Sequence, residues 1–446
     1  GAFVEEILAT VNAARCSQQD LLARWPRDAG VFSFLLAHHI LVAAGDEERL
    51  DGRVPLPAPG EKSPGMSLYL LLSQDCNLGC VYCLNGKRTY RKAEQPRMSE
   101  VVAFRAVETF AAAIQPGGYL EIALFGGEPL LNWELAKKTI DYTEQVLRPR
   151  YPDVRFCYHV TSNLSLLPDD FIERARRHNM TVLCDIDGAG AVHDALRPFK
   201  GGGSSHGQIA RNVRQLISAG IPVSLRTTVT ARNQDDMEAT ARHHRELGAI
   251  GSAFVPVNIT NSDEELIGDD LIPDIERMLA AFEGIKDCGQ WSLDRLFPFS
   301  TYRAKLQPGN QSVLGCGAPF GNTPVVDAEG NVYPCIYLVG IERYHQGNII
   351  AGTYPRAAVL AELAEQLHVD TREDCRICAW RYLCGGGCPI HLLTMAEQTG
   401  ISPKARDYCD RINCAHTKKV LEILLWEMAE QAARQADGQE RRKEDE

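Results

Sequence analysis

Residues 66–83 read MSLYLLLSQDCNLGCVYC and join an apolar strand to a loop with three cysteines. The run Leu68–Leu72 is short, apolar and bounded by polar residues, which is typical of a strand buried in a parallel sheet. The loop spaces Cys76, Cys80 and Cys83 as C-x3-C-x2-C. Three thiolates on one loop can bind three irons of a 4Fe–4S cluster and leave the fourth iron open, as a catalytic metal requires. Taken alone, the spacing is also compatible with chance or with zinc, although no neighbouring Cys or His supplies the fourth ligand of structural zinc.

The alternation of strand-like and helix-like segments continues to about residue 260. Apolar runs like the first recur at Leu120–Phe125, Phe156–Val160, Val182–Ile186, Val223–Thr227 and Ala253–Val257. Amphipathic stretches with helical spacing lie between them, at Val101–Ile114, Glu134–Leu147, Asp169–His178, Gln208–Ala219 and Asp235–Leu247. This alternation predicts an α/β fold with a parallel sheet. Six units suit a partial (β/α)6 TIM-type barrel or a doubly wound sheet.

Polar residues follow every predicted strand. In chain order they read SQDCN, GGEP, TSN, DG, RTT and PVN. Parallel α/β folds bind their ligands at the carboxyl ends of the strands. Six such endings therefore predict an active site at that edge of the sheet.

The composition, with 45% hydrophobic and 24% charged residues in a chain of 446, is that of a soluble globular protein. No apolar run reaches the roughly 18–20 residues that cross a bilayer, and the first residues do not resemble a signal peptide. We therefore expect a cytoplasmic protein without a membrane partner. The formal net charge of −11 argues against a nucleic-acid partner, which would call for a basic face.

Fifteen cysteines are unusual for such a chain. Cys16, Cys157, Cys184 and Cys414 lie in helix-like or strand-like sequence and could be core residues. The other eleven lie in loops, mostly in clusters. In a reducing compartment such thiolates stay free for metals, and soft sulfur ligands favour zinc or iron–sulfur clusters.

The cysteine loop, with the aromatic Tyr82 before its third cysteine, resembles that of the radical S-adenosylmethionine (SAM) superfamily. The resemblance implies that SAM chelates the open iron. It also implies that one electron, from a reductant such as flavodoxin or ferredoxin, cleaves SAM to methionine and a 5′-deoxyadenosyl radical. The cofactors carry this chemistry, and the protein positions the target.

Three further segments resemble motifs of that superfamily. GGEP at 126–129 is similar to its methionine-binding turn, and TSN at 161–163 to its third-strand motif, although Leu164 replaces a Gly. DIDG at 185–188 is similar to the Ser-Ile-Asp-Gly of peptide-modifying members, with Asp in place of Ser. The residues that the resemblance places at SAM are Tyr82, Gly126, Gly127, Glu128, Pro129, Ser162, Asn163, Asp185 and Arg197. Arg197 could pair with a carboxylate or form a surface salt bridge.

Two more cysteine patterns lie in the C-terminal third. Cys316, Gly330 and Cys335 fit C-x13-G-x4-C, and the Gly-Asn at 330–331 predicts a tight turn that brings the two cysteines side by side. The block CRICAWRYLCGGGC at 375–388 fits C-x2-C-x5-C-x3-C. Alone, this block could also bind zinc. Together with the upstream pair it closely resembles the SPASM domain, the auxiliary-cluster domain of peptide-modifying radical SAM enzymes.

The SPASM pattern implies two auxiliary 4Fe–4S clusters beside the SAM-binding cluster, three in all. The expected ligands of the first are Cys316, Cys335 and Cys388, with Cys288 as the candidate for the fourth. Without Cys288, the open iron could coordinate a substrate thiolate. The expected ligands of the second are Cys375, Cys378, Cys384 and Cys409. Cys414 competes with Cys409, but its place in a helix-like segment favours a core role.

The resemblance covers about residues 66–415. The expected organisation is a helical region at 1–54, a linker at 55–65, the barrel at 66–275, a SPASM iron–sulfur domain at 276–430 and a disordered charged tail at 431–446. The helical region resembles the helical half of a leader-peptide recognition element. A plain helical cap is the alternative.

SPASM enzymes mostly modify ribosomally made peptides or proteins, so we expect an oxidoreductase that crosslinks a peptide, most simply through a Cys thioether. The resemblance includes the six-cysteine peptide type and the quinohemoprotein amine dehydrogenase type of thioether-forming maturase. In anaerobic sulfatase maturases an Asp base follows the second SPASM cysteine, where this chain has Ile336. Formylglycine formation is therefore the second hypothesis, beside cyclophane (C–C) crosslinking. An iron–sulfur electron carrier and a zinc-bound adaptor are the non-enzymatic alternatives, and no catalytic acid or base is identified.

Overall fold

The computed structural model describes residues 6–7, 10–11, 16–26, 29–37, 41, 61–83, 97–259, 268–288, 291–307, 310, 312–355, 357–395 and 401–444. Parts of the predicted helical region at 1–54 and the first part of the linker at 55–65 lie outside these ranges.

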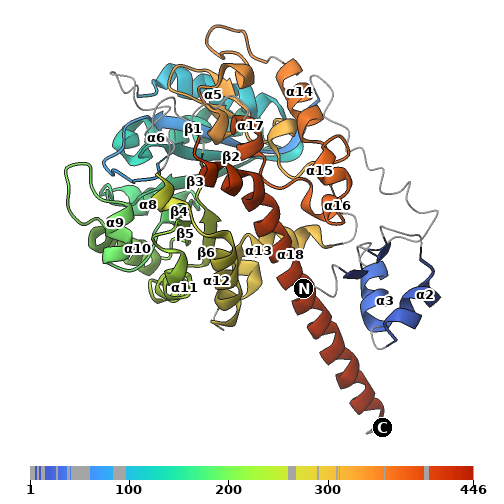
Figure 1. The fold of residues 1–446 in the computed structure, drawn as a ribbon. Helices are drawn as coiled ribbons and strands as arrows, with labels where there is room; N and C mark the ends of the chain where they lie inside the picture. The colour runs from blue at the N-terminus through green and yellow to red at the C-terminus, as the bar shows by residue number, and fades with distance from the viewer. Residues whose placement is uncertain are drawn as a thin grey trace.

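A nine-stranded sheet forms the centre of the described part of the chain (Figure 1). Its strands are β1 (Ser63–Ser73), β2 (Ile114–Gly126), β3 (Arg155–Ser162), β4 (Thr181–Asp185), β5 (Val223–Val229), β6 (Gly251–Pro256), β7 (Leu296–Phe297), β8 (Val325–Val326) and β9 (Val332–Tyr333). Their order is β7-β6-β5-β4-β3-β2-β1-β8-β9, and all neighbours are parallel except β8 and β9. The six predicted strands are confirmed. Because β1–β6 follow one another in sequence order, the partial (β/α)6 barrel is confirmed and the doubly wound alternative is excluded.

Helices fill the connections between these strands, as the alternating sequence predicts. They are α5 (Glu100–Ala112), α6 (Trp133–Tyr142), α7 (Arg148–Arg150), α8 (Phe171–Arg177), α9 (Ala191–Leu196), α10 (His206–Ser218), α11 (Met237–Glu246) and α12 (Ile275–Asp287). Side-chain caps fix two of their starts: the Ser99 hydroxyl accepts from the Val102 N–H at α5, and the Asp274 carboxylate accepts from the Arg277 N–H at α12.

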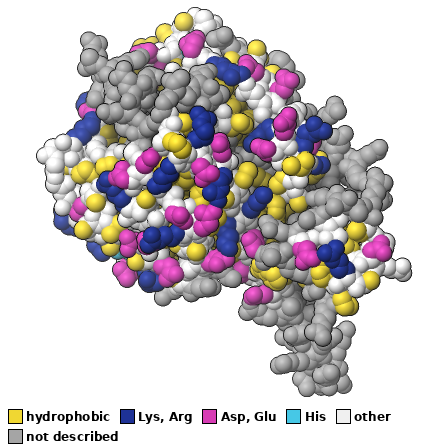
Figure 2. Space-filling model, viewed as in Figure 1, with side chains coloured by type: hydrophobic (Ala, Val, Ile, Leu, Met, Phe, Trp, Pro, Cys, Tyr) yellow, Lys and Arg dark blue, Asp and Glu magenta, His cyan; other side chains and the backbone are white. Residues whose placement is uncertain are grey.

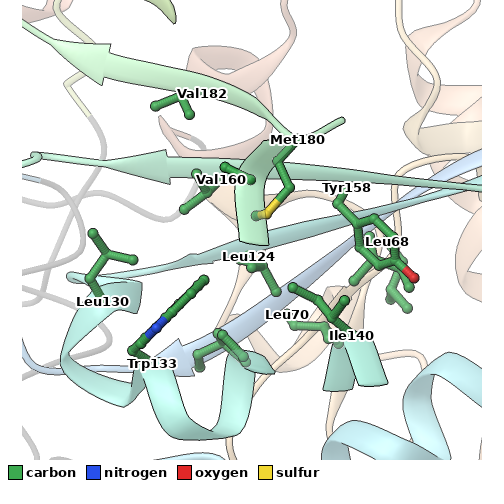
Figure 3. Close-up of a cluster of buried hydrophobic side chains, with 14 of the residues drawn as sticks. Leu68, Leu70, Leu124, Leu130, Trp133, Ile140, Tyr158, Val160, Met180 and Val182 are labelled. Carbon is green, nitrogen blue, oxygen red and sulfur yellow. The ribbon is translucent and has the colours of Figure 1, made fainter. Parts of the chain in front are cut away.

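The sheet packs against the surrounding helices through a continuous apolar core. Figure 3 shows Leu68, Leu70 and Leu124 of β1 and β2 beside Trp133 and Ile140 of α6. These five side chains are all buried. Burying one such side chain contributes about 1.5–3 kcal/mol, so this layer holds the strand ends at fixed positions.

The inner face of the sheet carries polar side chains among apolar ones. Ser224, Arg226 and Thr228 alternate along β5 and line an internal cavity, together with Asp185 at the end of β4. A strand repeats its side-chain direction every two residues, so these groups share one face. The barrel therefore presents several polar groups to this cavity.

The C-terminal segment consists of short elements and one long helix. It contains α13 (Phe299–Lys305), α14 (Ala357–Leu367), α15 (Glu373–Arg376), α16 (Arg381–Cys384), α17 (Ile390–Met395) and α18 (Pro403–Glu444). The predicted turn at Gly330 is confirmed: its φ is +88°, a conformation that suits glycine, and it joins the antiparallel strands β8 and β9.

Helix α18 corrects the expected C-terminus. The sequence predicts a disordered charged tail at 431–446, but α18 begins at Pro403 and continues to Glu444 (Figure 1). The segment QAARQADGQERRKE is rich in strong helix formers and holds no proline. Its helix propensity therefore favours an extension of α18, although its charged composition alone indicated disorder.

The N-terminal helices α2 (Gln18–Arg24) and α3 (Ala29–Ala37) lie beside this long helix, and α3 contacts α18. On the face that Figure 2 shows, acidic and basic side chains are intermixed. Among the described residues, no helix is both long enough and apolar enough to cross a bilayer.

Candidate active site

One cavity of about 960 Å³ runs along the inner face of the barrel and into the C-terminal segment. At the strand ends its wall contains the cysteine loop at 76–83, the turn at 126–127 and residues 161–163. At the other side it contains Cys316 and Cys388. The first cysteine motif and two of the C-terminal cysteines, more than 200 residues apart in sequence, therefore face one space.

The three cysteines of the loop lie close together. Burial raises the pKa of Cys76 to about 11, and the Cys83 thiol adds to the rise. Burial also raises the pKa of Cys80, Arg197 lowers it, and the other two thiols raise it. Thiols that influence one another in this way, on a loop open to a cavity, fit a cluster that replaces their protons by irons.

Two side chains that the sequence places at SAM also donate to these sulfurs. Asn163 Nδ2 lies 3.6 Å from Cys76 Sγ, and Arg197 Nη1 lies 3.7 Å from Cys80 Sγ. The Leu78 N–H also points to Cys76 Sγ, at 3.4 Å. Both side chains line the cavity as well, so a contact with SAM remains compatible with their positions.

A buried ion-pair network holds Arg197 in place. Its Nε donates to Asp187 at 2.7 Å and its Nη1 to Asp185 at 3.3 Å, while Arg226 donates to Asp185 at 2.6 Å. The Tyr82 hydroxyl donates to Asp187, and the guanidinium of Arg197 lies 5.2 Å from the Tyr82 ring centre. Burial acts to raise the pKa of Asp185, but Arg197 and Arg226 outweigh it and lower that pKa to about 2.

This network decides between the two alternatives for Arg197, which pairs with buried carboxylates. Arg197 is not in a surface salt bridge, since its side chain is only 7% exposed. Asp185, which replaces the family's Ser, already has two arginine partners, although it still lines the cavity. The Asp185–Arg226 pair thus gives the inner face of the barrel a charged wall.

Glu128 of the GGEP turn is used within the protein. Its carboxylate accepts from the Leu130 N–H, the Asn163 N–H and the Ser162 hydroxyl at 2.8–2.9 Å, and the side chain is fully buried. Neither Glu128 nor Pro129 lines the cavity. The Glu128 carboxylate thus links the ends of β2 and β3, and its expected place at SAM stays a prediction.

Gly126 and Gly127 have a steric reason to be glycine. A Cβ on Gly126 would lie 2.3 Å from the Ser73 carbonyl oxygen, and one on Gly127 would lie 2.4 Å from that of Asp75. Both glycines line the cavity. The close approach places the turn directly beside the cysteine loop.

The structure brings together three of the expected auxiliary ligands. Burial raises the pKa of Cys335 to about 12, and the nearby Cys388 and Cys316 thiols raise it further. Burial raises the pKa of Cys388 to about 11, again with a contribution from Cys316. We call Cys316, Cys335 and Cys388 the first auxiliary trio.

Cys288, the candidate for the fourth ligand of the first auxiliary cluster, follows α12 directly. Its thiol donates to the Ile285 carbonyl at 3.1 Å, at the end of α12, and packs in the apolar core around that helix. Its expected role as the fourth ligand stays a prediction.

A second group forms around Cys384, and it includes Cys414. Burial raises the pKa of Cys384 to about 11, and Cys414 and Cys378 raise it further. Cys414 and Cys378 also raise the pKa of Cys375, whose burial is the larger cause. Cys409 is buried in the apolar core, and none of the described cysteines contributes to its raised pKa. Cys409 therefore lies in the core, whereas Cys414 lies near Cys375 and Cys384, and the choice between them as ligand stays a prediction.

Helix geometry explains why Cys409 and Cys414 have different surroundings. Cys409 and Cys414 both lie on α18. Residues five apart on an α-helix point about 140° apart, so only one of them can face Cys375, Cys378 and Cys384.

The fit of these groups to iron–sulfur clusters rests on donor chemistry. Soft thiolates favour such clusters, in which each cysteine binds a different iron. Within the described ranges, no three His, Cys, Asp or Glu side chains converge as ligands of a single metal ion. The thiols in each group lie near one another, as a cluster requires.

Sequence reasoning missed several residues that line the cavity. They are Arg226, Lys305, Tyr337, His391 and His416. The sequence held a local sign that Arg226 could face the cavity. Arg226 stands in RTT at the end of a predicted strand, where polar and apolar residues alternate. The others lie in the C-terminal segment, and only tertiary contacts bring them to the cavity.

Comparison with known proteins agrees with this geometry. Residues 70–244 match the model of the radical SAM superfamily. The chain is 26% identical over 356 residues to the serine-type anaerobic sulfatase-maturating enzyme of Klebsiella aerogenes, covering 76% of this chain and 84% of that protein. It is 27% identical over 335 residues to the mycofactocin maturase MftC of Mycolicibacterium smegmatis, covering 71% of this chain and 76% of that protein.

The fold is also that of a solved structure, native anSMEcpe with bound AdoMet (SAM) and the Cp18Cys peptide. The two superpose with a TM-score of 0.63 and 17% identity, covering 81% of this chain and 99% of that chain. The cysteine loop, the strand ends around it and the sequence match agree: this chain carries a radical SAM domain at residues 70–244 and is a radical SAM enzyme.

Proposed function

We propose that this enzyme is a maturase that modifies a ribosomally made peptide in the cavity between the cysteine loop and the first auxiliary trio. The observation that carries the proposal is that Cys80 and Cys388 line the same cavity of about 960 Å³. A space of this size accepts a peptide side chain together with SAM. The similar proteins described above, a sulfatase-maturating enzyme and a mycofactocin maturase, support this class of reaction.

Cys76, Cys80 and Cys83 would hold the SAM-binding cluster, with Gly126, Gly127 and the residues at 161–163 around SAM. When bound and reduced there, SAM supplies a 5′-deoxyadenosyl radical that takes a hydrogen atom from carbon. The chain's own residues have other tasks. Asn163 and Arg197 restrain the sulfurs, and Arg226 with Asp185 shapes the wall against which the peptide lies.

The C-terminal cysteines would hold two auxiliary clusters. The first auxiliary trio would bind one and leave an iron open toward the cavity, since Cys316 and Cys388 line it. Cys375, Cys378, Cys384 and Cys414 would bind the other. Three clusters correspond to about 12 irons per chain. An iron and sulfide assay on anaerobically reconstituted protein tests this count, and a zinc protein without sulfide would contradict it.

We further propose that the product is an intrapeptide crosslink, most simply a Cys thioether. Forming it removes a hydrogen atom from a carbon and a proton from the cysteine sulfur, and the surplus electron passes to an auxiliary cluster. Ile336 supports this choice, because it lines the cavity at the position where a sulfatase maturase has its Asp base. A crosslink formed at a cluster-bound sulfur does not require a carboxylate there.

Formylglycine formation is the second candidate, and the likeness to sulfatase-maturating enzymes favours it. One experiment separates the two. The enzyme is incubated with reductant, SAM and the peptide encoded beside its gene, and the product is sequenced by mass spectrometry. Loss of two hydrogens without a new carbonyl, together with a blocked cysteine, supports the crosslink. An aldehyde at Cys or Ser supports formylglycine, and release of deoxyadenosine without peptide modification contradicts both.

A further inference from the structure

Lys305 lies between the two groups of C-terminal cysteines. It is the last residue of α13, and its ammonium group donates to the Cys384 carbonyl at 3.0 Å and to the Gly315 carbonyl at 3.3 Å. Gly315 precedes Cys316, a member of the first auxiliary trio, while Cys384 belongs to the second set. One side chain therefore bonds to the backbone of both ligand loops.

The two loops touch at this point. A Cβ on Gly315 would lie 2.6 Å from the Gly385 carbonyl oxygen and 3.0 Å from the Gly387 nitrogen. Gly385 and Gly387 have φ values of +64° and +63°, so the GGG turn at 385–387 relies on glycine to pass beside the other loop. Lys305 thus bonds to both loops beside the point where they are in contact.

Its charge reaches thiols of both sets. Burial lowers the pKa of Lys305, and the Cys384 and Cys316 thiols raise it. Among the groups that act on Cys316 and Cys384 in the described structure, Lys305 is the cation common to both. The side chain is partly shielded from water, with its Nζ 5.2 Å from the Tyr302 ring centre, so its field is less screened than that of a surface lysine.

Reduction adds one negative charge to an iron–sulfur cluster, and a fixed positive charge nearby stabilises the reduced state. We propose that Lys305 is a positioning residue for electron transfer, whose ammonium group raises the reduction potentials of both auxiliary clusters at once. The inference rests on the proposed function, which places clusters at the two sets. Removal of this one charge should then shift two potentials together and leave the SAM-binding cluster unchanged.

The test uses three substitutions in the full chain. K305Q keeps an N–H donor for the two carbonyls but removes the charge, K305M removes both, and K305R keeps both. K138Q is the matched control, because Lys138 is an exposed lysine on α6 that pairs with Glu100. Each protein is reconstituted anaerobically, assayed for iron and sulfide, and titrated with reductant while the electron paramagnetic resonance signals are followed.

For K305Q we expect wild-type iron content and more negative midpoint potentials for both auxiliary clusters. K305R and K138Q should match the wild type. Wild-type potentials in K305Q would overturn the proposal and leave Lys305 as a link between loops. Loss of auxiliary iron in K305Q would overturn it too, since the neutral donor would then have failed to hold the loops. A wild-type protein with only about four irons would instead contradict the proposed auxiliary clusters themselves.

Discussion

At the scale of single residues, the site depends on charges that are buried and paired. Arg197 and Asp187 are the most enclosed of these, with side chains 7% and 0% exposed and a 2.7 Å hydrogen bond between them. Removing one partner of such a pair leaves an uncompensated charge, which costs about 3–5 kcal/mol. The main effect of this pair on stability is therefore the free energy that is lost when one partner is removed.

We expect R197Q to lower the free energy of unfolding by about 3–5 kcal/mol, because Asp187 is left buried without its cation. The double variant R197Q/D187N should lose clearly less than the sum of the two single variants. Urea unfolding of the four proteins measures this cycle. Additive losses would show that the two side chains do not act as a pair.

Glu128 gives a pH-dependent prediction. Burial raises its pKa from 4.5 to about 7, against the lowering effect of three hydrogen bonds. The folded protein therefore holds this proton more tightly than the unfolded chain, so the contribution to stability is complete below pH 4.5 and is lost as the pH rises to about 7. Over this window the wild type should lose up to about 3 kcal/mol relative to E128Q, which cannot titrate.

Urea unfolding at several pH values measures the difference between the two proteins. E134Q, which changes an exposed glutamate on α6, serves as the control and should follow the wild type. Parallel curves for wild type and E128Q would contradict the prediction.

At the scale of secondary-structure elements, α18 decides which cysteine is available for the second auxiliary set. Cys414 faces that set, and Cys409 packs in the core. We expect C414A to lose about four irons per chain, because its cluster lacks a ligand, while C409A keeps the wild-type content. Iron and sulfide assays on both variants, made in parallel, test the assignment. The reverse result would return the ligand role to Cys409.

The strands and most helices could be predicted from sequence, because their signals are local. A run such as Leu68–Leu72 bounded by polar residues defines β1 within a few residues, and the order of strands and helices defines the barrel. The direction in which a helical residue points can be predicted only when the bounds of its helix are known. The start of α18 at Pro403 was missed, and with it the direction of Cys409 and Cys414.

The site shows the same limit. The cysteine loop and the GGEP turn follow from spacing and from their place after strands. Lys305 could not be found in this way, because its partners Gly315 and Cys384 are 10 and 79 residues away. The internal role of Glu128 could not be found either. Its three hydrogen-bond donors come from two segments that are separate in sequence, and only the folded chain brings them together.

At the scale of the whole molecule, the cavity links the barrel to the cysteine-rich segment. Strands β8 and β9 extend the barrel sheet beyond β1, so Cys335, which follows β9, lies at the edge of the same sheet whose β1 leads into the cysteine loop. This continuity fixes the distance between the two ends of the cavity. A peptide bound there would meet both ends without a large rearrangement of the chain.

The most direct test of the account is whether SAM binds to a cluster held by Cys76, Cys80 and Cys83. A variant with Cys316, Cys378 and Cys414 replaced by Ala removes ligands from both auxiliary sets and should retain about four irons. Its reduced cluster is then examined by electron paramagnetic resonance with and without SAM. We predict that SAM changes the spectrum and that a further C80A substitution abolishes both the signal and the release of deoxyadenosine. An unchanged spectrum on addition of SAM would contradict the central claim.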